Sequence, residues 1–161
     1  MGLFSKENCA FCNKTIGMFT KKAMNDKKYI CKDCIKKCSA FIKIKNYDSE
    51  YIRNHIEYMK KQNELYEKEF KTLDNLHKII PLPFSGIVFA DDIAMFEVID
   101  SKTIGKNFKE LFRYDQIRSF QLYTNKNNSG EGKKYSEVGV RIFYIQKTLL
   151  IMKILMKMIK K

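Results

Sequence analysis

Four cysteines near the start of the chain have a spacing that indicates a metal site. They form two Cys-x-x-Cys pairs, Cys9 with Cys12 and Cys31 with Cys34, and eighteen residues separate the pairs. Two such pairs at a separation of about fifteen to twenty residues are typical of a tetrahedral Zn²⁺ site, because each pair bends back and directs both sulfurs to one ion. Four thiolates leave no coordination position for water or substrate, so this spacing predicts structural rather than catalytic zinc.

The residues around the pairs carry the turn and strand signals needed to bring them together. An Asn-Asp-Lys turn at 25–27 precedes strand-forming residues at 29–30, which predicts a short hairpin between the pairs. Apolar residues within 35–42 fit a short helix, so we expect Cys31 and Cys34 at a helix start, as in treble-clef modules. Residues 1–45 have too few apolar side chains to form an independent core. Zinc binding would supply on the order of 10 kcal/mol of apparent folding free energy.

Disulfide bonds are the alternative use of these cysteines. They need an oxidising compartment, and the residues at 1–6 lack the apolar run and layout of a secretory signal. Neither pair follows a strand in a βαβ pattern, which disfavours a redox role. The fifth cysteine, Cys38, is expected to be a free thiol, with replacement of Cys34 as a ligand left as an alternative. We therefore expect reduced thiols in a cytoplasmic protein.

No residue pattern in the sequence indicates an active site. His55 and His77 have no Cys, Asp or Glu arrangement that pairs them, and we expect both to be surface or half-buried aromatic residues. The sequence has no Gly-rich phosphate loop, nucleophile elbow or zincin histidine pair. Asp91 and Asp92 lie between strand-like segments, where such a pair is typical of a turn. We therefore expect that the protein is not an enzyme.

Residues 1–4, the first cysteine pair with Ile16 and Gly17 after it, and residues 29–34 resemble a known family. It is an uncharacterised bacterial family catalogued as domain of unknown function number 4428, a zinc-finger module at protein N-termini. The resemblance covers about the first 45 residues, and the family has no known activity. It implies that the metal ligands are Cys9, Cys12, Cys31 and Cys34.

A second resemblance lies at residues 111–122 (Leu-Phe-Arg-Tyr-Asp-Gln-Ile-Arg-Ser-Phe-Gln-Leu). This segment is similar to one in bacterial pleckstrin-homology-like domains, and the similarity concerns fold more than function. Such a domain normally has more strands before its closing helix than the sequence pattern predicts here. An incomplete domain and a diverged one are therefore both left open.

The basic residues are concentrated at the two ends of the chain. The formal net charge is +13, and residues 1–45 contain eleven lysines and three acidic residues, while residues 130–161 contain eight basic and two acidic residues. Such ends could attract nucleic acid or an anionic membrane surface. Lysine greatly outnumbers arginine, however, and arginine is the residue suited to bidentate phosphate contacts, so we favour a solvated basic surface.

An amphipathic helix is predicted over residues 49–71. Asp48 or Ser49 can cap its first turn, and the apolar residues recur at steps of three and four, interrupted by Asn63. We expect the helix to pack within the chain, with a coiled-coil dimer as the alternative. The apolar residues are Ile52, Ile56, Met59, Tyr66, Phe70 and Leu73.

After Pro81 and Pro83 the hydrophobic period changes to two, which indicates a small antiparallel sheet. The pattern predicts a hairpin of strands 86–90 and 94–99, a short strand or turn at 108–112, and paired strands at 117–124 and 135–145. Residues 147–161 have lysines at helical spacing opposite apolar residues, which predicts a basic amphipathic helix.

The fold expected is α+β in three stretches: a four-cysteine zinc-ribbon or treble-clef-like module (1–45), an amphipathic connecting helix (46–80), and an antiparallel, pleckstrin-homology-like β domain with a C-terminal helix (81–161). No run of about eighteen uncharged apolar residues exists, so a membrane-spanning helix is not expected.

We expect a non-catalytic binding or adaptor protein with structural Zn²⁺ and a protein partner whose identity the sequence does not specify. One alternative is nucleic-acid binding through the basic zinc module, where Phe11, Phe19 and Tyr29 could stack on bases. The same aromatic residues could instead form the core of the module. The other alternative is peripheral attachment to an anionic membrane through the basic helix at 147–161.

Overall fold

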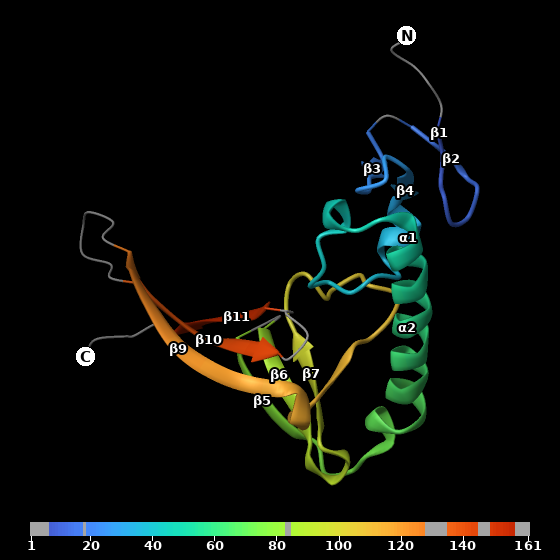
Figure 1. Ribbon diagram of the computed structural model, residues 1–161. Coiled ribbons are helices and arrows are strands. Elements are labelled where there is room, and N and C mark those ends of the chain that lie inside the picture. The colour runs from blue at the N-terminus through green and yellow to red at the C-terminus, as the bar shows by residue number, and fades with distance from the viewer. Residues whose placement is uncertain (1–6, 18, 83–84, 128–134, 145–148, 157–161) are drawn as a thin grey trace. The chain divides into compact units, whose positions relative to one another are not determined.

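The structure, a computed structural model, describes residues 7–17, 19–82, 85–127, 135–144 and 149–156 (Figure 1). The chain divides into two compact units. Unit 1 consists of Met1–Glu67 and Gly105–Glu110, and unit 2 consists of Lys68–Ile104 and Leu111–Lys161. The long helix, Ser49–Lys68, therefore lies almost entirely in the same unit as the cysteine segment. The later segment Gly105–Glu110 belongs to this unit as well.

The described residues of unit 1 form two small antiparallel sheets and two α-helices. The hairpin predicted between the cysteine pairs is confirmed: its turn is closed by a hydrogen bond from the Met24 amide to the Lys28 carbonyl at 2.9 Å, and Lys27 adopts a φ of 63°. The elements are β1 (Glu7–Asn8) paired with β2 (Thr15–Ile16), β3 (Lys21–Ala23) paired with β4 (Tyr29–Cys31), α1 (Lys32–Ile35), the 3-10 turn η1 (Ile44–Asn46) and α2 (Ser49–Lys68).

The second cysteine pair lies at a helix start, as predicted, because Cys31 is the N-cap of α1 and Cys34 lies in its first turn. The helix ends at Ile35, however, so the expectation of a helix within 35–42 is wrong. After Lys36 the backbone bonds tighten to 3-10 spacing, because the Lys37 amide donates to the Cys34 carbonyl and the Cys38 amide to the Ile35 carbonyl, both at 3.1 Å. The Ser39 amide then donates to Nε2 of His55 at 3.1 Å, and Nζ of Lys106 donates to the Ile35 carbonyl at 3.1 Å, so tertiary partners hold the chain in this non-helical path.

Helix α2 is capped as predicted and ends slightly earlier than predicted. A carboxylate oxygen of Asp48 accepts from the Tyr51 amide at 2.7 Å, which satisfies one of the free amides of the first turn. The α-helix ends at Lys68, and Phe70–Thr72 form the 3-10 turn η2. Ile52 is completely buried and belongs to the same core cluster as the cysteines.

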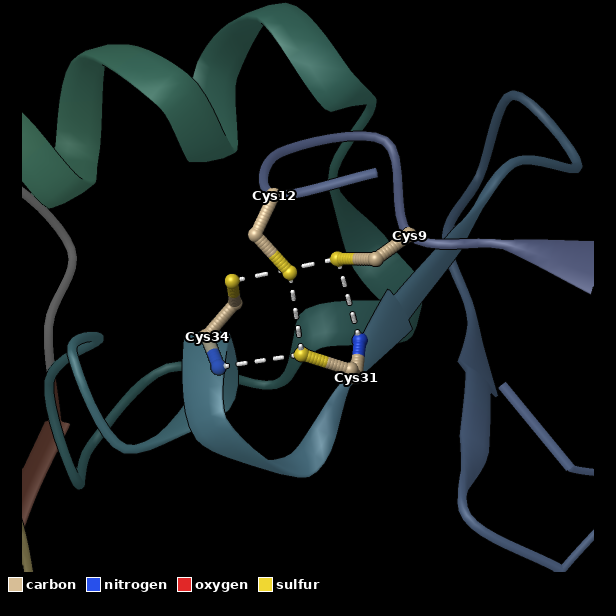
Figure 2. Close-up of side chains that lie close together, drawn as sticks. All are labelled: Cys9, Cys12, Cys31 and Cys34. Atoms are coloured by element: carbon tan, nitrogen blue, oxygen red, sulfur yellow. Dashed lines mark hydrogen bonds between the residues drawn. The ribbon is translucent and has the colours of Figure 1, made fainter. Parts of the chain in front are cut away.

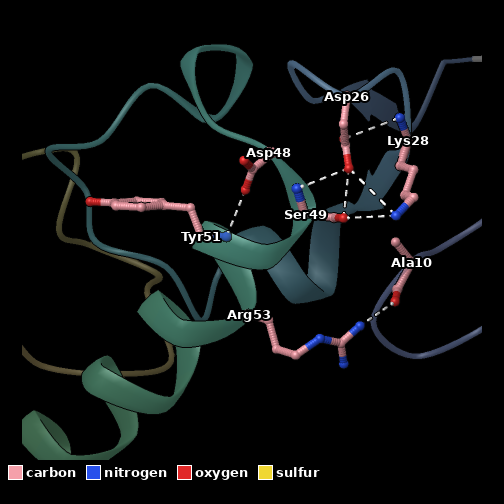
Figure 3. Close-up of polar contacts among 7 residues, drawn as sticks. All are labelled: Ala10, Asp26, Lys28, Asp48, Ser49, Tyr51 and Arg53. Atoms are coloured by element: carbon pink, nitrogen blue, oxygen red, sulfur yellow. Dashed lines mark hydrogen bonds and ion pairs between the residues drawn. The ribbon is translucent and has the colours of Figure 1, made fainter.

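The hairpin turn is also bonded to the first turn of α2 (Figure 3). A carboxylate oxygen of Asp26 accepts from both the amide and the hydroxyl of Ser49, at 3.1 and 2.6 Å, and these bonds, the Ser49 hydroxyl foremost, lower the pKa of Asp26. Lys28 lies beside both residues, with Nζ 3.1 Å from the Ser49 hydroxyl. Arg53 donates to the carbonyl of Ala10 at 3.4 Å. The loops of the cysteine segment therefore hold α2 at its N-terminal end.

Unit 2 contains two antiparallel sheets. The predicted hairpin is confirmed, because β6 pairs with β7 from Gly86↔Ile99 to Ala90↔Met95, and Asp91–Ile93 form the turn. The four-stranded sheet has the order β5 (His77–Leu82), β6 (Ser85–Ala90), β7 (Met95–Ile99) and β8 (Leu111–Arg113); the three-stranded sheet has the order β11 (Leu149–Met156), β10 (Tyr135–Tyr144) and β9 (Ile117–Asn127), and η4 (Tyr114–Gln116) precedes β9.

Strand β5 was not predicted, because it contains Pro81. Proline has no amide hydrogen for a ladder and is tolerated on an edge strand. Here β5 is an edge strand of its sheet, and its register with β6 shifts between Ile79 and Leu82, around the proline. The predicted strands at 117–124 and 135–145 are confirmed as β9 and β10, and the uncertain segment at 108–112 forms β8 from Leu111.

The predicted helix at 147–161 is wrong where the structure describes it. Leu149–Met156 form strand β11, which pairs with β10 from Phe143↔Leu149 to Ser136↔Met156. A short apolar run does not distinguish helix from strand by periodicity, and the edge of β10 offers a ladder of backbone partners. Residues 147–148 and 157–161 lie outside the described residues. Within the described part of the chain, no helix has the length and apolar character needed to cross a membrane.

Candidate metal centre

The side chains of the four predicted cysteines point toward one another (Figure 2). Their sulfurs all lie within 4.8 Å of one another, with Sγ–Sγ distances of 3.8 Å for Cys9 and Cys34 and 3.7 Å for Cys12 and Cys31. Four sulfurs about 2.3 Å from one tetrahedral ion lie about 3.8 Å apart, so the arrangement fits a metal ion at its centre. All five cysteines of the chain are free thiols.

A tight turn after β1 places Cys9 and Cys12. The Cys9 amide donates to the Lys14 carbonyl at 2.9 Å, and the Asn13 amide donates to the Cys9 carbonyl at 2.9 Å. Asn13 adopts a φ of 57°, a left-handed conformation that asparagine tolerates better than most residues. This residue lets the chain reverse directly after the second cysteine of the pair.

The end of β4 and the start of α1 place Cys31 and Cys34. Cys31 is the N-cap of α1, and its sulfur accepts from the Cys34 amide at 3.4 Å. The Cys31 amide donates in turn to the sulfur of Cys9 at 3.4 Å, so the two pairs are bonded to each other through the backbone. Amide hydrogens directed at sulfur stabilise the thiolate form, which is the form that binds a metal ion.

The pKa shifts of the buried thiols indicate that a bound cation would stabilise their deprotonated forms. Burial by itself raises the pKa of Cys9, but the amide hydrogen bonds it accepts, chiefly from Cys31, lower that pKa to about 6. Burial raises the pKa of Cys31 and of Cys34. Four thiolates in contact, three of them buried, would repel one another, and a bound divalent cation removes this cost. Thiolate donors select soft or borderline ions, with zinc the usual choice for four cysteines.

Cys38 lies outside the four-sulfur group. It is 1% exposed and donates to the Cys34 carbonyl at 3.6 Å, and burial raises the pKa of its thiol to about 11. The structure thus brings Cys34, and not Cys38, together with the other three sulfurs.

The two histidines and Asp91 make structural contacts. His55 stacks with Tyr51, with ring centroids 6.1 Å apart, and burial together with the charge of Lys106 lowers its pKa to about 4, so it is neutral. His77 lies on β5 with its ring 6.3 Å from that of Phe89. Asp91 lies in the turn before β7 and accepts from the Tyr114 hydroxyl at 2.6 Å.

Only one of the three aromatic residues suggested for base stacking is free to stack. Phe11 and Tyr29 pack against the core of unit 1. Each also has a cation over its ring, Arg53 at 5.6 Å from Phe11 and Lys21 at 4.4 Å from Tyr29. Phe19, in the turn between β2 and β3, is 98% exposed.

The two Cys-x-x-Cys pairs and the hairpin between them can be compared with known families. Residues 7–55 match the family described as "Domain of unknown function (DUF4428)". The DUF4428 match includes both cysteine pairs and continues through the first two turns of α2, which agrees with the burial of Ile52 in the core of the cysteine segment. No curated protein and no solved structure matches the chain.

A group of polar residues that the sequence analysis did not single out lies next to the four-cysteine site. The hydroxyl of Ser39 donates to the carboxylate of Glu110, and Nζ of Lys106 donates to the Ile35 and Ser39 carbonyls at 3.1 and 3.4 Å. Burial raises the pKa of Glu110 to about 7, although Ser39 and Lys106 act in the opposite direction. About seventy residues separate these partners in sequence, so no local pattern could have indicated the contact.

Proposed function

We propose that unit 1 is a structural zinc-binding module in a non-catalytic binding or adaptor protein. The observation that carries this proposal is the placement of four cysteine sulfurs at the separations expected around one tetrahedral ion. The four ligands would be Cys9, Cys12, Cys31 and Cys34.

The surroundings of the sulfurs support a structural role for the ion. Four protein ligands complete a tetrahedron and leave no position for water or substrate. Cys9, Cys31 and Cys34 are buried and form part of the core cluster of unit 1, so the ion would take the place of a larger apolar core. Zinc would crosslink the first cysteine pair to the second.

We further propose that unit 2 is a pleckstrin-homology-like domain that carries the binding role. Seven antiparallel strands in two sheets of four and three, each joining strands that follow one another along the chain, support this proposal. Strands β5 and β11 are the two that the sequence pattern did not predict. With them, the described residues of unit 2 form seven strands, and the segment expected to be the closing helix contributes one of these strands.

Metal analysis of the purified full-length protein tests the zinc proposal. We expect about one equivalent of zinc per chain without added metal. Replacement of the zinc by Co²⁺ should give the intense charge-transfer and visible absorption bands of tetrahedral cobalt bound to thiolates. A protein that holds no metal, or a cobalt spectrum typical of octahedral oxygen ligands, would contradict the proposal.

Nucleic-acid binding by unit 1 is a second candidate, favoured by the exposure of Phe19 next to Lys21 and Lys22. Stacking of one base on an aromatic ring contributes about 1–3 kcal/mol, so Phe19→Ala should weaken binding of a single-stranded oligonucleotide at least about fivefold. Binding should also weaken steeply as salt concentration rises. Fluorescence anisotropy measures both effects, with Phe11→Leu as a control for a ring that is already covered. Affinity that is insensitive to salt and to Phe19 excludes this candidate.

A further inference from the structure

Residues 105–110, which we name the return segment, lie in the connection between β7 and β8 and are part of unit 1. Gly105 begins the segment with a φ of 76°, a conformation that glycine adopts without strain. The segment has no regular secondary structure, so its backbone groups depend on other parts of unit 1 for partners.

The return segment binds the chain directly after the second cysteine pair. The Asn107 amide donates to the Lys36 carbonyl at 2.9 Å. Lys106 donates to the carbonyls of Ile35 and Ser39, and half-burial of its ammonium group lowers its pKa. We name residues 35–39 the post-cysteine turn. Three of its five carbonyls are therefore occupied by the return segment.

Ser39 joins the post-cysteine turn to both the return segment and α2. It is 3% exposed, its hydroxyl donates to Glu110, and its amide donates to Nε2 of His55. A further bond links the return segment to α2, since the Lys109 amide donates to the side chain of Asn63 at 2.9 Å. Asn63 is the residue that interrupts the apolar stripe of α2, and this contact gives it a role.

The position of the post-cysteine turn depends on Cys34. The Lys37 amide donates to the Cys34 carbonyl at 3.1 Å, and Cys38 donates to the same carbonyl through its sulfur. A metal ion that crosslinks Cys34 to the first cysteine pair would therefore fix the carbonyls that the return segment needs. Without the ion, α1 is a single four-residue turn and has little stability of its own.

We infer that the metal centre controls attachment of the return segment: with the metal bound, residues 105–110 are held on the post-cysteine turn, and loss of the metal releases them. Release would free the Lys36 and Ser39 carbonyls, the ammonium of Lys106 and the carboxylate of Glu110 together. The module would then act as a metal-dependent switch on the β7–β8 connection. This inference rests on the proposed zinc site.

Hydrogen–deuterium exchange of the full-length protein, with zinc and after its removal by a chelator, tests the inference. The amides of Asn107 and Lys109 should exchange at least about tenfold faster without zinc, because each loses a hydrogen bond. Peptides from β6 and β7 should exchange at unchanged rates. The inference is overturned if the return segment exchanges equally in both states, or if β6 and β7 accelerate to the same degree. A protein without zinc would overturn the proposed function as well, so metal analysis of the sample separates the two failures.

Lys106→Met provides an independent arm, because it keeps the alkyl chain and removes the ammonium group. The zinc content should stay at about one equivalent, while exchange at Asn107 should become several-fold faster in the zinc-bound protein. Lys102→Met is the matched control, since Lys102 is exposed in the same connection and outside the return segment. Unchanged exchange in Lys106→Met, or equal acceleration in Lys102→Met, would show that the return segment is not held in this way.

Discussion

Replacing Cys34 with serine should abolish stoichiometric zinc binding and unfold the cysteine module. The serine hydroxyl is a poor zinc ligand at neutral pH, and a structural zinc ion contributes on the order of 10 kcal/mol of apparent folding free energy. This exceeds the free energy of unfolding that a segment with such a small core can have without metal. Elemental analysis gives the zinc content, and circular dichroism at the helical band gives the loss of structure.

Cys38→Ser is the matched control for this prediction. Cys38 lies four residues from Cys34 and is equally buried, but its sulfur is outside the four-sulfur group. The serine hydroxyl can still donate to the Cys34 carbonyl, so zinc should stay at about one equivalent with a destabilisation of about 1 kcal/mol. Equal loss of zinc from both variants would mean that Cys38 takes part in binding, and retention of zinc by Cys34→Ser would remove the proposed site.

Ile52→Ala should weaken zinc binding although Ile52 is not one of the four proposed ligands. Ile52 is completely buried in the core cluster that contains the cysteines, and its truncation should cost about 3 kcal/mol. Because zinc binding and folding of the module are coupled, this cost should appear as a roughly 100-fold weaker apparent zinc affinity. Competition with a chromogenic chelator measures the affinity.

Asn54→Ala on the same helix is the control for Ile52→Ala. Asn54 is exposed, and alanine has the higher helix propensity, so the zinc affinity should change by less than about threefold. If Ile52→Ala leaves the zinc affinity unchanged, then α2 does not fold together with the cysteine module. The helix would then be a separate connecting element, as the sequence pattern suggested.

The start of α2 contacts the cysteine segment, which the sequence pattern treated as a separate stretch. The sequence suggested a connecting stretch at 46–80, but Asp26 in the hairpin accepts from Ser49, and Arg53 donates to Ala10. These contacts cross the expected boundary at residue 45. The family match, which continues to residue 55, agrees with a module that includes the start of the helix.

Residue types and spacings were enough to predict the features whose physics is local. The cysteine spacing predicted the four residues whose sulfurs converge, the turn at 25–27 predicted the hairpin between them, and Asp48 predicted the start of α2. The hairpin of β6 and β7 was predictable for the same reason. In each case the deciding interactions join residues that are close in sequence, or one metal-binding geometry dictates the spacing.

Other features depend on partners far away in the chain, so they were not predictable from local patterns. Residues 149–156 form a strand rather than a helix, because β10 provides a ladder that periodicity does not reveal. Helix α1 ends at Ile35, and the chain beyond it is held in a non-helical path by His55 and Lys106, which bond the Ser39 amide and the Ile35 carbonyl. Attachment of the return segment joins Ser39 to Glu110, residues that only the folded chain brings together. Contacts of this kind leave no local trace, since many sequences with the same local pattern lack the distant partner.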